Sequence, residues 1–142
     1  MKLLGFNFTK VSIEKFSDKF ENLKVNSNID ISEINEVKQS MLKSKDSVLS
    51  VKFSYSLDYT PERAKIELKG NFLISLDPKL TKKILKEWES KKIPEEFKVP
   101  LFNLIIKKSN VKALSLEEDL NLPLHMPMPR VSKKGNQNKK SK

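Results

Sequence analysis

The chain has 142 residues, a formal charge of +10, one histidine and no cysteine. This length suits a single domain with one core. The lack of cysteine excludes disulfides, thiolate nucleophiles and zinc-thiolate sites, and agrees with a reducing compartment. There is no run of about 18 apolar residues, and residues 1–5 are too short for a signal-peptide core. We therefore expect a cytoplasmic protein with no membrane insertion.

The excess positive charge is concentrated at the carboxyl end. Six basic residues and no acidic ones lie between Arg130 and Lys142. The Lys, Gly, Asn, Gln and Ser composition there cannot bury apolar surface. We expect a single α+β domain over residues 1–131, followed by a disordered basic tail over residues 132–142. The tail serves either as a solubilising segment or as an electrostatic contact for nucleic acid or an acidic partner.

Two amino-terminal segments have the alternation expected of strands. Phe6 and Phe8 alternate with polar residues at even positions, and Val11 and Ile13 continue the alternation at odd positions. One extra residue in the strand, a β-bulge, produces such a shift of parity. A second strand is predicted over residues 25–31, where three branched residues share one parity although asparagines weaken the strand propensity.

The strongest pattern runs from Val48 to Ile74. Strict period-two alternation over residues 49–59 resumes over residues 64–74, and residues 60–63 have turn chemistry. This predicts a long antiparallel hairpin. Because one face is aromatic and branched, we expect helices or another subunit to cover it.

Two helices are predicted after the hairpin. Asp77-Pro78 is a favourable helix start, and Leu80, Ile84, Leu85 and Trp88 form one apolar stripe. Trp88 is interpreted as a core residue, with a ligand platform as the alternative. A second start at residues 93–96 is followed by Pro100, which we expect to kink or restart the helix. The long helix is predicted from about Val99 to Leu120, with an end that frays because acidic residues oppose the helix dipole.

An apolar ribbon follows, defined here as residues 120–129. Its apolar residues recur at every second position, and three prolines hold the backbone extended. The ribbon either seals the domain's own core or forms a flexible surface for partners. The candidate polypeptide-binding residues are Leu120, Leu122, Leu124, Met126 and Met128. If the sheet face is not core, Phe53, Tyr55 and Tyr59 are alternatives.

The residues typical of catalysis are sparse. His125, the single histidine, lies within the ribbon and is expected to contact solvent. Only three glycines are present, and no phosphate-binding or hydrolase motif occurs, which argues against nucleotide binding. Residues 117–119 are interpreted as a solvated acidic face rather than a metal site. We expect no cofactor and no enzyme activity.

The order of four strand-like segments, a helix and a longer helix resembles that of the SecB export chaperone family. Residues 101–103, Leu-Phe-Asn, and residues 120–123, Leu-Asn-Leu-Pro, look like two segments of that family. The resemblance implies a four-stranded antiparallel sheet followed by two helices packed on one face. It also implies a homo-oligomer that holds unfolded or nascent polypeptides in apolar grooves without ATP.

An alternative function is that of a ribosome- or RNA-associated accessory protein. In that case the nucleic-acid contacts are electrostatic and come from the tail. The residues concerned are Lys133, Lys134, Lys139, Lys140 and Lys142. A small enzyme of an unfamiliar type is a third possibility, and it would require a pocket with converging titratable groups.

Overall fold

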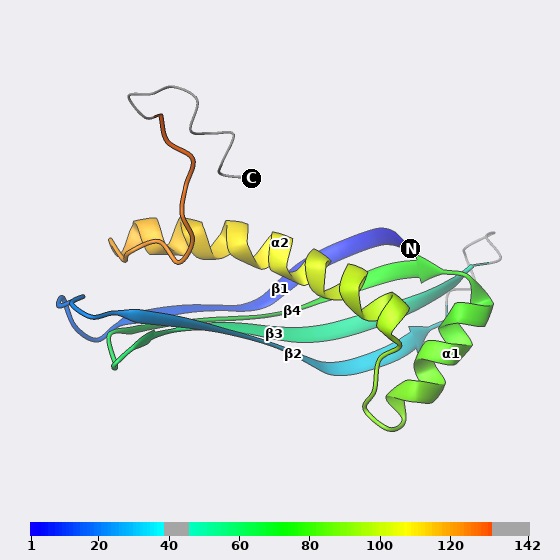
Figure 1. Ribbon diagram of the computed structural model, residues 1–142. Helices are drawn as coiled ribbons and strands as arrows, with labels where there is room; N and C mark the ends of the chain where they lie inside the picture. The colour runs from blue at the N-terminus through cyan, green and yellow to red at the C-terminus, as the bar shows by residue number, and fades with distance from the viewer. Residues whose placement is uncertain (39–45, 132–142) are drawn as a thin grey trace.

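The computed structural model describes residues 1–38 and 46–131. Four strands are followed by two helices, which confirms the predicted α+β class (Figure 1). The elements are β1 (Lys2–Lys15), β2 (Lys24–Val37), β3 (Ser47–Thr60), β4 (Ala64–Leu76), α1 (Pro78–Trp88) and α2 (Glu95–Asp119). The predicted basic tail lies outside the described residues. Among those described, no helix is long and apolar enough to cross a membrane.

The strands form one antiparallel sheet in the order β1-β4-β3-β2. The predicted hairpin is confirmed as β3 and β4, with Leu49 opposite Ile74 and Tyr59 opposite Ala64. The inward-facing residues of the pair are buried because α2 lies along that face (Figure 1). Phe53, Tyr55 and Tyr59 are therefore core residues, so the condition under which they were alternative binding residues is not met.

The predicted bulge in the first strand is present. Phe8 pairs with Gly70 and Lys10 pairs with Lys69, so Thr9 is the extra residue between them. The bulge lets the apolar residues on both sides of Thr9 point to the same face although their parity differs. Phe6 lies on this face and stacks on Phe72, with ring centroids 5.7 Å apart.

The second strand is longer than predicted. Residues 25–31 form its first half, and pairing with β3 continues to Val37 opposite Val48. Ile34, which is buried, supplies the apolar contact of the added half. A register shift between Ile31 and Glu33 marks a bulge at Ser32. Tertiary pairing thus outweighs the low strand propensity of the polar residues in this segment.

The long helix is continuous through Pro100. The predicted helix start at residues 93–96 is confirmed, since the helix begins at Glu95. The separate start near Val99 is wrong, because Pro100 lies inside the helix without ending it. Proline removes only the hydrogen bond to the carbonyl of Glu96, which is exposed and accessible to water. Buried Phe97 and Leu101 fix both sides of the proline against the core.

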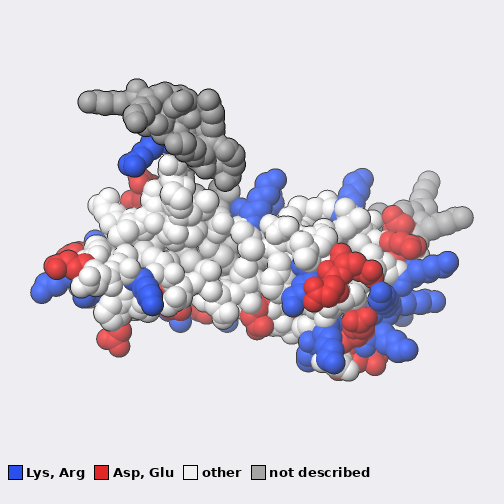
Figure 2. Space-filling model, viewed as in Figure 1, with Lys and Arg blue, Asp and Glu red and all other residues white. Residues whose placement is uncertain are grey.

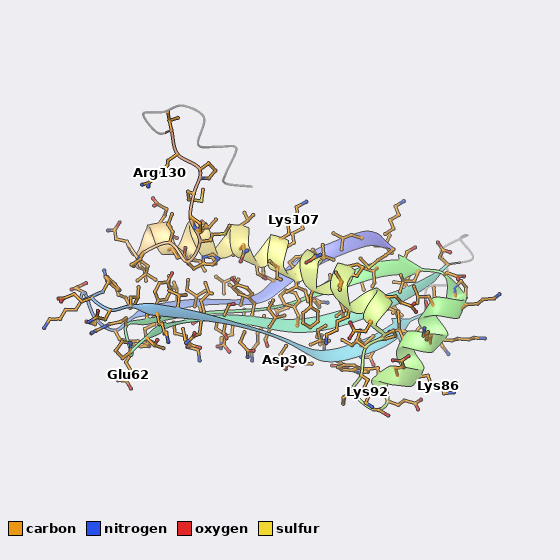
Figure 3. The ribbon with its side chains drawn as sticks, viewed as in Figure 1. Asp30, Glu62, Lys86, Lys92, Lys107 and Arg130 are labelled. Carbon is orange, nitrogen blue, oxygen red and sulfur yellow. The ribbon has the colours of Figure 1, made fainter. Side chains whose placement is uncertain are left out.

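The opposite face of the sheet is polar. On β3 it carries Ser50, Lys52, Ser54, Ser56 and Asp58, each of which alternates with a buried residue. Figure 3 shows α2 over one face of the sheet and no helix over the other. The two core clusters therefore lie on a single side of the sheet, between it and the helices.

Candidate functional site

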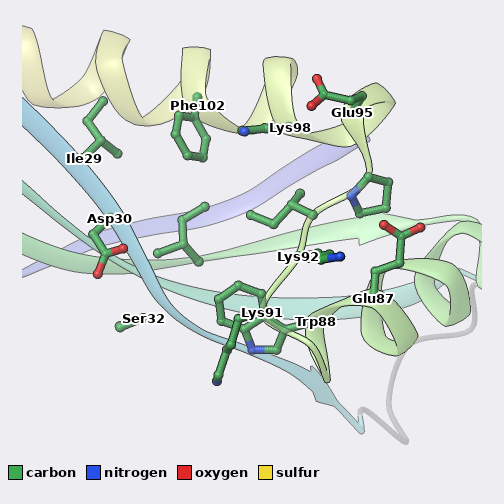
Figure 4. Close-up of a pocket in the computed structure, with 13 residues that line it drawn as sticks. Ile29, Asp30, Ser32, Glu87, Trp88, Lys91, Lys92, Glu95, Lys98 and Phe102 are labelled. Carbon is green, nitrogen blue, oxygen red and sulfur yellow. The ribbon is translucent and has the colours of Figure 1, made fainter.

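A cleft lies at the edge of the sheet, where β2 meets the loop between α1 and α2. It has a volume of about 760 Å³. β2 supplies four consecutive residues, 29–32, and the rest of the lining comes from the end of α1, the loop and the first turns of α2 (Figure 4). Both faces of the strand contribute to the lining, so the cleft opens onto the free edge of β2. Within the described part of the chain, no strand pairs with the backbone groups along that edge.

The cleft is lined by half-buried aromatic and branched side chains. Trp88 at the end of α1 and Phe102 on α2 lie on either side of the cleft (Figure 4), and Ile93 of the loop also lines it. All three also pack against the first core cluster. Trp88 is thus a core residue, as predicted, and it also forms part of the cleft wall, which sequence reasoning treated as the alternative.

Lysine side chains lie over both aromatic rings. Lys91 Nζ is 4.7 Å from the centre of the Trp88 ring, and Lys98 Nζ is 6.0 Å from the centre of the Phe102 ring. Both are cation–π contacts at an exposed site, where such contacts are weak and a ligand can displace the flexible lysine chains. The charged residues of the lining are balanced: Asp30, Glu87 and Glu95 against Lys91, Lys92 and Lys98.

The balance of charge extends over this end of the molecule. Figure 2 shows basic and acidic side chains mixed around α1, and a broad area without charged groups over the middle of the molecule. The cleft therefore offers apolar walls and a free strand edge, with no net charge to select a ligand by sign.

The ribbon lies at the other end of α2. Leu122 is 5% exposed and packs in the second core cluster, and Leu120 packs against the same cluster. Leu124, Met126 and Met128 are 40%, 36% and 51% exposed. The ribbon thus has an inner side that seals the core and an outer side that faces solvent. The interpretation of the ribbon as a seal holds for Leu120 and Leu122, and contact of its outer side with partners stays a prediction.

The prediction that His125 contacts solvent is wrong. Its side chain is only 8% exposed, and its Nδ1 lies 2.8 Å from Glu117 Oε2. Glu117 is itself fully buried, so the interpretation as a solvated face is wrong for this residue, whereas Glu118 and Asp119 are exposed as that interpretation expects. The helix continues to Asp119, and Glu117 accepts a 2.6 Å hydrogen bond from Tyr59 Oη.

Burial also changes the acidity of the two tyrosines beside this carboxylate. Loss of solvent raises the pKa of Tyr55 to about 12, and the charge of Glu117 adds to this effect. The pKa of Tyr59 is raised further by burial and by its hydrogen bond to Glu117. Both hydroxyls therefore stay protonated near neutrality and act as hydrogen-bond donors.

Sequence reasoning missed the cleft because it depends on the path of the loop between the helices. The available signal was a pair of aromatic residues, Trp88 and Phe102, each with a lysine three or four positions away. The lysines assigned to nucleic-acid binding, Lys133 to Lys142, lie outside the described residues. No group of three or more histidine or acidic residues suited to a metal occurs among residues 1–38 and 46–131.

No family model matches the chain, and no curated protein matches it. Among solved structures, it is similar to the SecB-like chaperone Rv1957 of Mycobacterium tuberculosis, solved in complex with a ChAD peptide from the antitoxin HigA1 (Rv1956). The match covers 92% of this chain and 87% of that one, with a TM-score of 0.53 and 11% identity. The fold resemblance inferred from the order of elements is confirmed, and the chain has a SecB-like fold.

Proposed function

We propose that this protein is an ATP-independent chaperone that holds unfolded or nascent polypeptides. The observation that carries the proposal is the aromatic-lined cleft open to the unpaired edge of β2. The neighbour of similar fold is a chaperone with a bound peptide, which supports a non-enzymatic, polypeptide-binding role. The outer side of the ribbon, with Leu124, Met126 and Met128, is proposed as a second contact surface.

An extended segment of client fits this cleft through two kinds of contact. Its backbone hydrogen-bonds to the free edge of β2, which requires no particular sequence. Its apolar side chains displace the lysine stems and pack on Trp88 and Phe102, removing apolar surface from water. Because the charges around the cleft are balanced, polypeptides of positive or negative net charge can both bind. Burial of apolar surface drives binding, so no nucleotide is needed.

The two surfaces lie at opposite ends of α2, which sets a length requirement. At a rise of about 1.5 Å per residue, a helix of 25 residues spans roughly 37 Å. An extended chain covers at most about 3.5 Å per residue, so a client needs roughly 11 residues to reach both surfaces. Shorter peptides are therefore expected to bind one surface only, and to bind more weakly than a chain that contacts both surfaces at once.

The test is aggregation of a reduced, unfolded model protein with and without this chain. Protection is expected from the full chain and from a version truncated after Val131, and it should fall when Trp88 or Phe102 is replaced by alanine. Val99→Ser is the matched control, since Val99 is 58% exposed on the same helix and does not line the cleft. Thermal unfolding of each variant separates loss of binding from loss of folding.

Two outcomes contradict the proposal. Equal protection by the Trp88 and Phe102 variants would remove the cleft from the binding surface. Failure of every version to protect, together with salt-sensitive RNA binding that truncation after Val131 abolishes, would favour the ribosome- or RNA-associated role. If the triple replacement of Leu124, Met126 and Met128 by serine leaves protection against aggregation unchanged, the ribbon is excluded as a binding surface and the cleft is not.

We further propose that the chain self-associates through its other sheet edge. Leu3, Leu4 and Val11 of edge strand β1 are 37%, 44% and 44% exposed, and Val111 of α2 is 68% exposed. Exposed apolar residues on an unpaired edge strand are typical of a covered surface. Sedimentation over a concentration series is expected to give a mass above that of the monomer, and Leu4→Lys should lower it. A monomeric mass at every concentration contradicts the proposal.

A further inference from the structure

The buried carboxylate of Glu117 depends on the ribbon for its partners. Tyr59 Oη donates to Oε2, but the other two contacts come from His125: its ring Nδ1 lies 2.8 Å from Oε2, and its backbone N–H donates to Oε1 over 3.3 Å. A buried charge without partners is strongly unfavourable. Glu117 is therefore fully compensated only while the ribbon lies against α2.

The second nitrogen of the same ring is also held. His125 Nε2 lies 3.1 Å from Asn110 Oδ1, which accepts a 2.7 Å hydrogen bond from Tyr55 Oη. Both ring nitrogens thus face oxygen atoms. A doubly protonated ring donates to both, whereas a neutral ring donates to one. The ring bridges Asn110 and Glu117, which are two helical turns apart on α2.

The start of the ribbon is held by hydrogen bonds from Leu122 N–H to the carbonyl of Glu117 over 2.9 Å and from Lys15 Nζ to the carbonyl of Leu120 over 3.2 Å. Beyond Leu122, the polar anchor other than His125 is weaker. Tyr59 Oη lies 2.8 Å from the carbonyl oxygen of Pro123 and 2.6 Å from Glu117 Oε2. A phenol has a single hydrogen, so these two acceptors share one donor. The histidine, with three contacts of its own, is therefore the main polar connection between residues 123–126 and the rest of the described fold.

We infer that the Glu117–His125 pair is a latch that holds residues 122–126 of the ribbon closed over α2 and β3. Breaking the pair releases this segment while the sheet stays folded. Release uncovers apolar groups that are now buried, among them Leu116 and Leu122 at 8% and 5% exposure. These groups would then extend the apolar surface of Leu124 and Met126. Their use by a client rests on the proposed function, whereas the latch itself does not.

A double-mutant cycle tests the latch in the full chain. The variants are Glu117→Gln, His125→Asn and the two combined, and the readout is hydrogen exchange of the ribbon amides. Each single variant is expected to speed exchange over residues 122–126 by at least about tenfold, since a hydrogen bond to a charged group is worth that factor or more. The double variant should match the single ones, because either change alone opens the latch.

Two further variants keep the test specific. Glu118→Gln removes an exposed acid next in sequence to Glu117 and should leave ribbon exchange unchanged. Asn110→Ala removes the partner of His125 Nε2 and the acceptor of Tyr55 Oη but leaves the Glu117–His125 pair in place, so it should give a smaller increase than His125→Asn. This variant also serves as the test should Glu117→Gln not fold.

Three results overturn the latch. These are unchanged ribbon exchange in His125→Asn, additive effects in the double variant, and equal acceleration throughout β3 and β4, which would mark a purely structural role. The link to function is measured separately, by binding of a reduced, unfolded protein to the wild type and to His125→Asn. An opened ribbon with unchanged binding supports the latch and overturns only its role in client binding.

Discussion

Gly70 has no room for a side chain, which makes its replacement by alanine a sharp test of the sheet. A Cβ atom at this position would lie 2.5 Å from the carbonyl oxygen of Asn7 and 3.0 Å from two ring atoms of Phe53. Ordinary van der Waals contacts begin near 3.4 Å. The nearest atom belongs to the backbone of β1, so a side-chain rotation cannot relieve it. Either β1 moves away from β4 or the Phe53 ring leaves its place in the core.

The size of the effect follows from two opposing terms. Overpacking in a core costs about 1–3 kcal/mol, and a backbone clash belongs at the upper end of that range. Replacing glycine in a strand returns about 0.5–1 kcal/mol by restricting the unfolded chain. A net loss of about 2 kcal/mol in the free energy of unfolding is expected. For a chain of this size, that lowers Tm by roughly 8 °C.

The matched control is Gly5→Ala, because a Cβ at Gly5 has no atom within 4 Å. Gly5→Ala restricts the unfolded chain without introducing a clash, so this variant should be as stable as the wild type or slightly more stable. Urea unfolding followed by circular dichroism gives both free energies. Equal stability of the two variants would refute the close approach of β1 to β4 at Gly70.

The remaining predictions concern stability and its dependence on pH. Ser109→Ala should raise the free energy of unfolding by about 1 kcal/mol, because the fully buried hydroxyl of Ser109 has no hydrogen-bond partner among the described residues; a loss in calorimetry would contradict this. Leu122→Ala should cost about 2–5 kcal/mol in denaturant unfolding and Leu124→Ala well under 1 kcal/mol, and equal costs would contradict the two-sided ribbon. Because burial raises the pKa of Tyr55 above that of the unfolded chain, stability should fall as pH rises from about 10 towards 12, less steeply in Tyr55→Phe; an unchanged slope would argue against burial as the cause.

The sheet was predictable because its signal is local. Alternation is complete from Leu49 to Thr60 of β3 and throughout β4, so the parity of a residue there identifies its face. The switch of parity after Phe8 predicted a bulge, and the bulge is at Thr9. Both edge strands are longer than predicted, and β2 was underestimated because its polar sequence gives a weak local signal and its length is set by pairing with β3.

The site was less predictable because it joins distant parts of the chain. Tyr59 meets Glu117 across 58 positions, and no periodicity relates the two residues. A lone histidine in a proline-rich segment normally indicates solvent contact. His125 is buried instead because it lies against the buried carboxylate of Glu117, which is eight positions away. The start of α2 was misplaced for a local reason: Pro100 was weighed as a helix breaker, although burial of Phe97 and Leu101 secures the helix around it.

The bulges have a consequence for the behaviour of the protein at high concentration. Both edge strands are interrupted, β1 at Thr9 and β2 at Ser32, and Ser32 lies within the cleft itself. A bulge breaks the regular spacing of free backbone groups that an added strand needs. A chain docking on β2 therefore finds a short template that cannot extend along the whole edge. The geometry permits reversible capture and disfavours the continuous strand stacking from which amyloid fibres grow.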